Sequence, residues 1–248
     1  MNQLGHAAAI ILAAGRGTRM KAKNKNKVAF NLGGKPMITR AVDNLKSAGI
    51  GQIIVVVGFQ SESVKRAIGT GVEYAVQKEQ LGTGDALKSA LPLLRPDITS
   101  VLSVYGDDSA FYPISLYQEM VDKRQALDVP LIFLTLHKED PHGLGRIIRN
   151  ANGEVQKIVE EKNASEQERL VQEINTGFYC FDRHFLDNYI GLVKRNPLTG
   201  EFYATDMVEI ALSQGLKVEA MLAEDDSIWH GVNSRSDFAR AQARLRHE

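Results

Sequence analysis

Residues 7–20 read AAAIILAAGRGTRM, an apolar run that ends abruptly in a loop of glycines and arginines. The run from Ala7 to Ala13 is continuously apolar, as strands buried on both faces of a parallel sheet are. Glycines in the loop let backbone N–H groups turn inward, and Arg19 and Lys27 add positive charge. A buried strand followed by such a loop predicts a binding site for a polyphosphate.

The bulk composition indicates a neutral globular chain. It has 248 residues, 44% of them hydrophobic, which suffices to bury the core of one large domain. Lys plus Arg and Asp plus Glu number 30 each, so the net charge is zero. A neutral chain shows no tendency to wrap a nucleic acid or to lie on an anionic membrane. We therefore expect neither a nucleic acid nor a membrane as a partner.

The sequence also bears on location and redox state. The N-terminal apolar run is too short for a membrane span and lacks a cationic leader, so we expect a cytoplasmic protein. The one cysteine, Cys180, lies in the apolar stretch from Gly177 to Phe181. Because free cysteine is among the most buried residue types, we expect a packed thiol in a strand.

Strands and helices alternate over the first half of the chain. The expected strands are Ala7–Ala13, Ile53–Val57, Val72–Val76 and Ser100–Tyr105. The expected helices between them are Pro36–Ala48, Ser61–Ile68 with Ser61 as its cap, and Gly84–Leu91. This alternation predicts an α/β fold, a Rossmann-like and mostly parallel sheet with helices on both faces.

The second half of the chain has a mixed pattern. The expected strands are Leu131–Leu136, Arg146–Asn150, Glu154–Val159 and Ile174–Phe181, the middle two forming a hairpin through Asn152-Gly153. Helices are expected near His184–Lys194, Thr205–Ser213 and Ser236–Arg246. Because no repeat, low-complexity tract or linker interrupts the chain, we expect a single domain over residues 1–248.

Three polar segments each follow a predicted strand: residues 15–19, 77–84 and 105–107. Ligands of open α/β sheets bind beyond the carboxyl ends of the strands, so we expect the three segments to lie together. In the second segment, glycines allow close approach of a ligand, and the Gln77 amide can pair with a base edge. A plain helix start capped by Thr83 is compatible with the same residues.

The third segment, from Tyr105 to Asp108, places carboxylates at a strand end. Mg²⁺ prefers one or two protein carboxylates completed by phosphates and water, so a magnesium site is one interpretation. The alternative is a turn in which Asp107 or Asp108 caps the next helix.

The first loop, residues 15–19, also fits an ordinary tight turn when it is taken alone. It does not match the dinucleotide-binding fingerprint, because Met20 stands where that pattern requires glycine.

Taken in order, these motifs resemble those of the sugar-1-phosphate nucleotidyltransferase family. Within it they are most similar to the N-terminal uridyltransferase domain of the bifunctional UDP-N-acetylglucosamine pyrophosphorylase. The resemblance extends from about Ala7 to Arg246. The segments that carry it are Leu12–Met20, Lys27-Val28, Gly34–Met37, Gln77, Leu81–Gly84, Tyr105–Asp107, Gly143–Ile147, Ile158–Lys162, Glu173–Gly177, Glu201–Asp206 and Gly231–Asn233.

This resemblance implies Mg²⁺-dependent transfer of a uridylyl group from UTP to N-acetylglucosamine 1-phosphate. It implies that Arg19 and Lys27 are catalytic, neutralising the phosphates, and that Asp107 and Asn233 bind the metal. The implied nucleotide-binding residues are Leu12, Ala13, Ala14, Gly15, Gly17, Thr18, Gln77, Gly82 and Thr83. The implied sugar-binding residues are Tyr105, Gly106, Gly145, Glu160, Asn175, Tyr203 and Thr205.

The resemblance also divides the domain. Residues 1 to about 110 would bind the nucleotide, and residues from about 111 to 248, with a smaller β subregion, would bind the sugar. The β-helix that carries acetyltransferase activity in the bifunctional relatives has no counterpart in this sequence. Because assembly of those relatives runs largely through the β-helix, we expect a monomer or a weak homodimer.

Four sites depart from the family pattern. Asn26 stands where relatives usually have proline, Ala29 where leucine is common, and Leu144 where tyrosine is common. Trp229-His230 replaces a segment that often carries an acidic residue. Alternative functions are therefore the same reaction with another sugar 1-phosphate or with dTTP, and a nucleotide-sugar sensor without turnover. A dinucleotide-binding dehydrogenase is disfavoured, because Met20 breaks the glycine pattern that binds dinucleotides.

Overall fold

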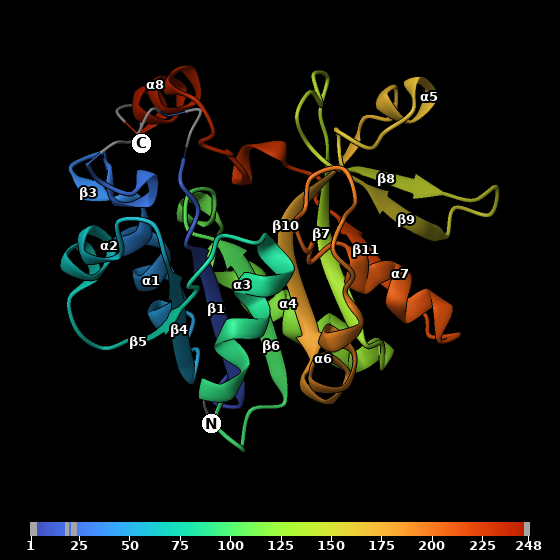
Figure 1. The fold of residues 1–248 in the computed structure, drawn as a ribbon, viewed down its shortest axis with the longest axis horizontal. Coiled ribbons are helices and arrows are strands. Elements are labelled where there is room, and N and C mark those ends of the chain that lie inside the picture. The colour runs from blue at the N-terminus through green and yellow to red at the C-terminus, as the bar shows by residue number, and fades with distance from the viewer. Residues whose placement is uncertain (1–3, 18–19, 21–23, 246–248) are drawn as a thin grey trace.

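The computed structural model describes residues 4–17, 20 and 24–245. The predictions for Thr18 and Arg19 lie outside the described residues. Within them, a nine-stranded sheet has the order β11-β7-β10-β6-β1-β4-β5, and β8 and β9 branch from β10 (Figure 1). No helix in these ranges is long and apolar enough to cross a membrane.

The first half forms the parallel part of the sheet. Its strands are β1 (Ala7–Ala13), β4 (Gln52–Val57), β5 (Glu73–Val76) and β6 (Ser100–Tyr105). The helices α1 (Met37–Ser47), α2 (Ser61–Ile68) and α3 (Thr83–Ala90) connect them. β1 lies between β4 and β6 and is parallel to both, as its continuously apolar sequence predicts.

The second half makes the sheet mixed. β7 (Leu131–His137) and β11 (Glu219–Leu222) pair in parallel, and β10 (Glu173–Asp182) runs antiparallel between β6 and β7. The hairpin of β8 (Arg146–Arg149) and β9 (Val155–Val159) pairs with β10 and projects beside α5 (Glu166–Arg169) (Figure 1). The remaining helices are α4 (Ile114–Leu127), α6 (Arg183–Tyr189), α7 (Asp206–Ser213) and α8 (Arg235–Arg244). A separate two-stranded sheet pairs β2 (Asn31–Leu32) with β3 (Lys35–Pro36).

The hydrophobic core lies in two layers, one on each face of the sheet. Alternate residues of β1 enter opposite layers. Ile11 belongs to the layer that includes residues of α1, α2 and α4, and Ile10 to the layer that includes residues of α3, α6 and α7. The expected helices on both faces are therefore confirmed. Cys180 is fully buried in β10, and burial raises the pKa of its thiol to about 12, which confirms a packed rather than reactive cysteine.

The structure corrects two predicted helix caps. The cap residue of α2 is Gln60, in a left-handed conformation with φ 53°, so Ser61 already belongs to the helix. The cap residue of α3 is Gly82, and the hydroxyl of Thr83 instead accepts a hydrogen bond from the Ala204 N–H, 2.9 Å away. Both loops are held by contacts with distant segments, which local sequence does not encode.

Candidate functional site

Two adjoining pockets open at the edge of the sheet where β1 and β6 end. The first has a volume of about 490 Å³ and the second about 220 Å³. Both are lined by Lys27, Tyr105 and Asp107, which therefore stand at their boundary. The three segments that the sequence places at strand ends do meet at one site.

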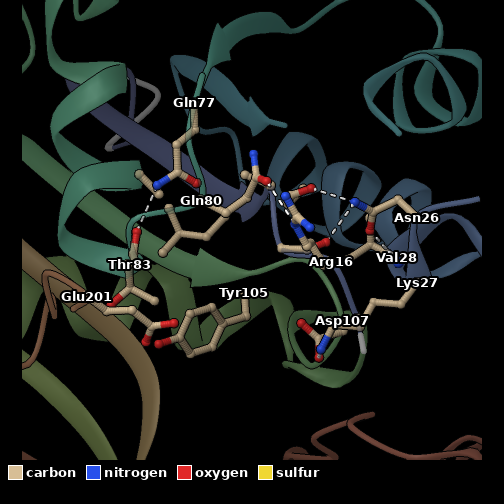
Figure 2. Close-up of a pocket in the computed structure, with 17 residues that line it drawn as sticks. Arg16, Asn26, Lys27, Val28, Gln77, Gln80, Thr83, Tyr105, Asp107 and Glu201 are labelled. Atoms are coloured by element: carbon tan, nitrogen blue, oxygen red, sulfur yellow. Dashed lines mark hydrogen bonds and ion pairs between the residues drawn. The ribbon is translucent and has the colours of Figure 1, made fainter. Parts of the chain in front are cut away.

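The first pocket gathers most of the residues predicted to bind a nucleotide. The predicted nucleotide-binding residues that line it are Leu12, Ala13, Ala14, Gly15, Gly17, Gln77, Gly82 and Thr83. Figure 2 also shows lining residues that were not among those predicted to bind the nucleotide: Arg16, Asn26, Val28, Gln80 and Glu201. Arg16 donates to the side-chain oxygen of Gln80 at 3.3 Å, which links the glycine loop to the segment after β5.

Asn26 holds the glycine loop in place. Its buried amide nitrogen donates to the carbonyls of Ala13, Gly15 and Phe59 at 3.0, 3.2 and 2.8 Å. Its amide oxygen accepts from the Val28 N–H at 3.2 Å and caps the short 3₁₀ helix η2 (Lys27–Ala29). One side chain thus fixes the loop after β1 and the residue, Lys27, that faces both pockets.

The backbone at Asn26 explains how this residue replaces the proline of relatives. Its φ of −63° is the angle that a proline ring imposes. Its N–H, which proline lacks, donates a hydrogen bond to the hydroxyl of Ser63 at 2.9 Å. Hydrogen bonds therefore hold Asn26 at a φ that a proline ring would also impose.

Lys27 lies between two oxygen ligands at the pocket boundary. Its ammonium is 2.5 Å from Asp107 Oδ2, 3.3 Å from Asn233 Oδ1 and 3.5 Å from the Val232 carbonyl. The Lys27 and Asp107 side chains are 17% and 10% exposed, so water screens this pair weakly. The oxygens of Asp107 and Asn233 already converge on one cation, and their chemistry also suits Mg²⁺.

The second pocket gathers four of the residues predicted to bind a sugar: Tyr105, Gly145, Glu160 and Asn175. Burial raises the pKa of the Glu160 carboxyl, and the hydroxyl of Thr205 donates to it at 3.3 Å. The Asn175 amide donates to the Tyr179 hydroxyl at 2.7 Å and accepts from the Gly177 N–H at 3.1 Å. These bonds fix the orientation of the Asn175 side chain before any ligand arrives.

Gly177 makes room for the ring that separates the pockets. Its φ is +83°, and a Cβ at this position would lie 2.0 Å from the Tyr105 ring. Any larger residue would displace Tyr105, which lines both pockets. The Asn-Thr-Gly sequence at 175–177 therefore combines a polar pocket residue with a steric requirement for glycine.

Trp229 adds a contact that the sequence did not predict. Its indole N–H donates to Asp108 Oδ2 at 3.2 Å, and both residues line the second pocket. Burial, with the neighbouring Asp107 carboxylate, raises the pKa of Asp108 well above its ordinary value. Asp108 occupies the cap position of η4 (Ser109–Phe111), but no side-chain cap bond forms there.

Three predicted sugar-binding residues do not line the second pocket as expected. Tyr203 and Thr205 line a third pocket, of about 370 Å³, that shares Glu160 with the second. Gly106 faces the core, where a Cβ would lie 2.7 Å from Ile38 Cδ1. Gly106 is thus explained by packing, whereas Tyr105 on the strand before it faces the site.

Comparisons with known proteins agree with this arrangement. The family model described as nucleotidyl transferase matches residues 8–248. The chain is 42% identical over 238 residues to the bifunctional protein GlmU of Exiguobacterium sibiricum, and 41% identical over 234 residues to that of Bacillus subtilis. These alignments cover 96% and 94% of this chain but 53% and 51% of the relatives, so the chain spans about half their length.

A solved structure shares the fold. It is a Bacillus anthracis protein provisionally assigned as a glucose-1-phosphate thymidylyltransferase. The TM-score is 0.78 with 23% sequence identity, and the match covers 98% of this chain and 96% of the other. The mixed, mostly parallel sheet with helices on both faces is therefore confirmed as a known architecture.

The role of Asn26 in stability can be measured directly. We expect Asn26→Ala to reduce the free energy of unfolding by about 1–3 kcal/mol, because it leaves buried carbonyls without donors. Urea denaturation followed by circular dichroism gives the change. Asn188→Ala, at an exposed amide, is the matched control and should unfold like the parent. An Asn26→Ala midpoint equal to that of the control would show that these bonds contribute nothing.

The raised pKa of Asp206 predicts that the stability of the protein depends on pH. Burial, with Glu209 and Glu160 nearby, raises the pKa of Asp206 from 3.8 to about 6. The folded state therefore binds the proton more tightly, and the free energy of unfolding falls as pH rises from about 4 to about 6. Asp206→Asn should weaken this fall. Urea midpoints at several pH values test it, and identical pH dependence in the two proteins would contradict it.

Proposed function

Since the chain belongs to the nucleotidyl transferase family, we propose that it transfers a uridylyl group from UTP to N-acetylglucosamine 1-phosphate. The products would be UDP-N-acetylglucosamine and pyrophosphate. One observation carries the proposal: two pockets of unequal size adjoin at a lysine and a carboxylate. Such a site suits two substrates whose phosphates must meet.

The two pockets divide the substrates. The larger would hold the nucleotide, with the base near Gln77 and the phosphates along the glycine loop of residues 15–17. The smaller would hold the sugar, with Glu160 and Asn175 hydrogen-bonding its hydroxyls and its N-acetyl group. Glu160 is half-buried, and burial raises the pKa of its carboxyl. A sugar that left this group without a hydrogen bond would bind at a cost, which favours a sugar that supplies one.

The proposed reaction is an in-line displacement at phosphorus. An oxygen of the sugar phosphate attacks the α-phosphorus of UTP and forms a new P–O bond. The bond from that phosphorus to its bridging oxygen breaks, and the electron pair leaves on pyrophosphate. Because the nucleophile is already an anion, the reaction needs no general base, and catalysis consists of positioning and charge neutralisation.

Lys27 has the central role in this scheme. It stands where the two pockets join, so its ammonium can neutralise phosphates that enter from either side. Asn26 keeps the backbone of Lys27 in place through the cap of η2. Arg19, which lies outside the described residues, remains a predicted second cation for the phosphates.

Magnesium belongs to the same proposal. Asp107 and Asn233 would hold the ion, since their oxygens already converge on the Lys27 ammonium. A bound Mg²⁺ would neutralise charge on the phosphate oxygens and help to orient them. Among the described residues, no group of three or more His, Cys, Asp or Glu side chains could hold a metal ion.

A second candidate changes the substrate and keeps the chemistry. Leu144 and Trp229 both line the second pocket, and both belong to segments that depart from the family pattern. Another sugar 1-phosphate is the alternative that these departures favour. The use of dTTP in place of UTP is a separate alternative, suggested by the thymidylyltransferase name of the structural neighbour. The cytoplasmic location and the monomeric or weakly dimeric state stay predictions.

Pyrophosphate release measures the substrates directly. With Mg²⁺, we expect the highest kcat/KM for UTP with N-acetylglucosamine 1-phosphate, because Glu160 and Asn175 of the second pocket would bind the amino sugar. N-acetylgalactosamine, glucosamine and glucose 1-phosphates, and dTTP, form the comparison set. Higher activity with another pair would reassign the substrate. No release with any pair, together with measurable UDP-sugar binding, would favour the sensor.

The metal ligand can be tested by one isosteric change. We expect Asp107→Asn to lower kcat by about 100-fold or more, because it removes charge needed to hold Mg²⁺ and to orient Lys27. Asp122→Asn, at an exposed carboxylate on α4, is the control and should keep the parental rate. Circular dichroism checks that both variants are folded. An unchanged Mg²⁺-dependent rate in Asp107→Asn would remove this residue from the mechanism.

A further inference from the structure

The amide of Gln77 is held by two acceptors on its nitrogen side. Gln77 follows β5 and is buried in the wall of the first pocket. Its Nε2 donates to the Gly82 carbonyl at 3.0 Å and to Asp85 Oδ2 at 2.8 Å. An amide nitrogen carries two hydrogens, so both are used within the protein.

These two bonds fix which end of the amide faces the ligand. Rotating the Gln77 amide by half a turn would bring its oxygen against a carbonyl and a carboxylate, which are both acceptors. The amide oxygen must therefore point the other way, and Figure 2 shows it on the pocket side of Gln77. No hydrogen bond recorded for the described part of the chain uses this oxygen.

The two acceptors are themselves anchored. Gly82 has a φ of +104°, and a Cβ there would lie 2.4 Å from the Phe202 carbonyl, so its backbone cannot shift easily. The same Phe202 carbonyl accepts from the Gly84 N–H at 2.8 Å. Asp85 lies in the first turn of α3, where the helix dipole favours a negative charge. The orientation of Gln77 therefore depends on rigid elements.

We propose that Asp85 is a positioning residue that selects the nucleobase through Gln77. Asp85 fixes the Gln77 oxygen toward the pocket. The site therefore accepts uracil or thymine, whose ring nitrogen N3 carries a hydrogen, and rejects cytosine, whose N3 does not. The inference rests on the proposed function in one respect: a pyrimidine nucleotide binds in the first pocket.

The selection follows from donor and acceptor chemistry. N3 of uracil and of thymine carries a hydrogen and can donate to the Gln77 oxygen. N3 of cytosine is an acceptor, so two acceptors would face each other in a buried site. Leaving a buried polar group unpaired costs more free energy than an average hydrogen bond contributes. The penalty for binding cytosine is therefore larger than the gain from the hydrogen bond to uracil or thymine.

Asp85 also has a purely structural explanation, which a pair of variants separates. A carboxylate in the first turn stabilises α3 by its charge alone. Asp85→Ala removes both the charge and the acceptor, whereas Asp85→Asn removes the charge and keeps an oxygen that can accept from Gln77. Stability should follow the charge, and base selection should follow the acceptor.

The experiment is titration calorimetry of UDP, dTDP and CDP, with Mg²⁺, against the parent and the two variants. We expect the parent to bind UDP at least about tenfold more tightly than CDP. Asp85→Ala should bring this ratio to within about threefold, and Asp85→Asn should keep most of it. Ser89→Ala, which removes a hydroxyl bonded to the Ala86 carbonyl on the same helix, is the control and should keep the parental ratio.

Each outcome decides the proposal. An unchanged UDP-to-CDP ratio in Asp85→Ala, equal binding of UDP and CDP by the parent, or equal loss of the ratio in both variants would overturn it. Selective UDP binding without pyrophosphate release from any substrate pair would overturn the proposed function but leave the role of Asp85 standing. Failure of all three nucleotides to bind would overturn both.

Discussion

The site depends on the ion pair between Lys27 and Asp107. The two side chains come from the η2 segment and from the end of β6, and they meet where the pockets adjoin. Both are largely buried, so removing one partner would leave a charge poorly solvated. The pair therefore ties the glycine loop to the end of β6 and keeps opposite charges at the place where phosphates would enter.

Asn26 and Gly177 show how the fold supports this pair. Asn26 joins the loop after β1 to the loop after β4 and fixes the backbone that presents Lys27. Gly177 leaves space for Tyr105, whose ring forms the wall between the pockets. One is a hydrogen-bond requirement and the other a steric one, and both act on residues at the shared boundary of the two pockets.

The sequence predicts the parts of this fold that rest on local pattern. β1, β6 and α2 have the bounds expected from apolar runs and periodicity, and the three strand-end segments converge as parallel topology requires. The helix α4, the edge strand β11 and both corrected caps were not predicted, because tertiary contacts determine them. The family resemblance implies that Tyr203 and Thr205 bind the sugar, and the structure places them in the third pocket, which shares Glu160 with the second.

Three side-chain amides in this site share one physical property. Asn26, Gln77 and Asn175 each donate to acceptors of the protein, so none is free to turn about its last bond. A preset amide presents a known donor or acceptor to the ligand and loses little freedom on binding. A sequence motif identifies the residue type but not which of its two faces meets the ligand. In this protein the neighbours Asp85 and Tyr179 determine that orientation, so a change at either could alter what the amide presents while the motif residue stays the same.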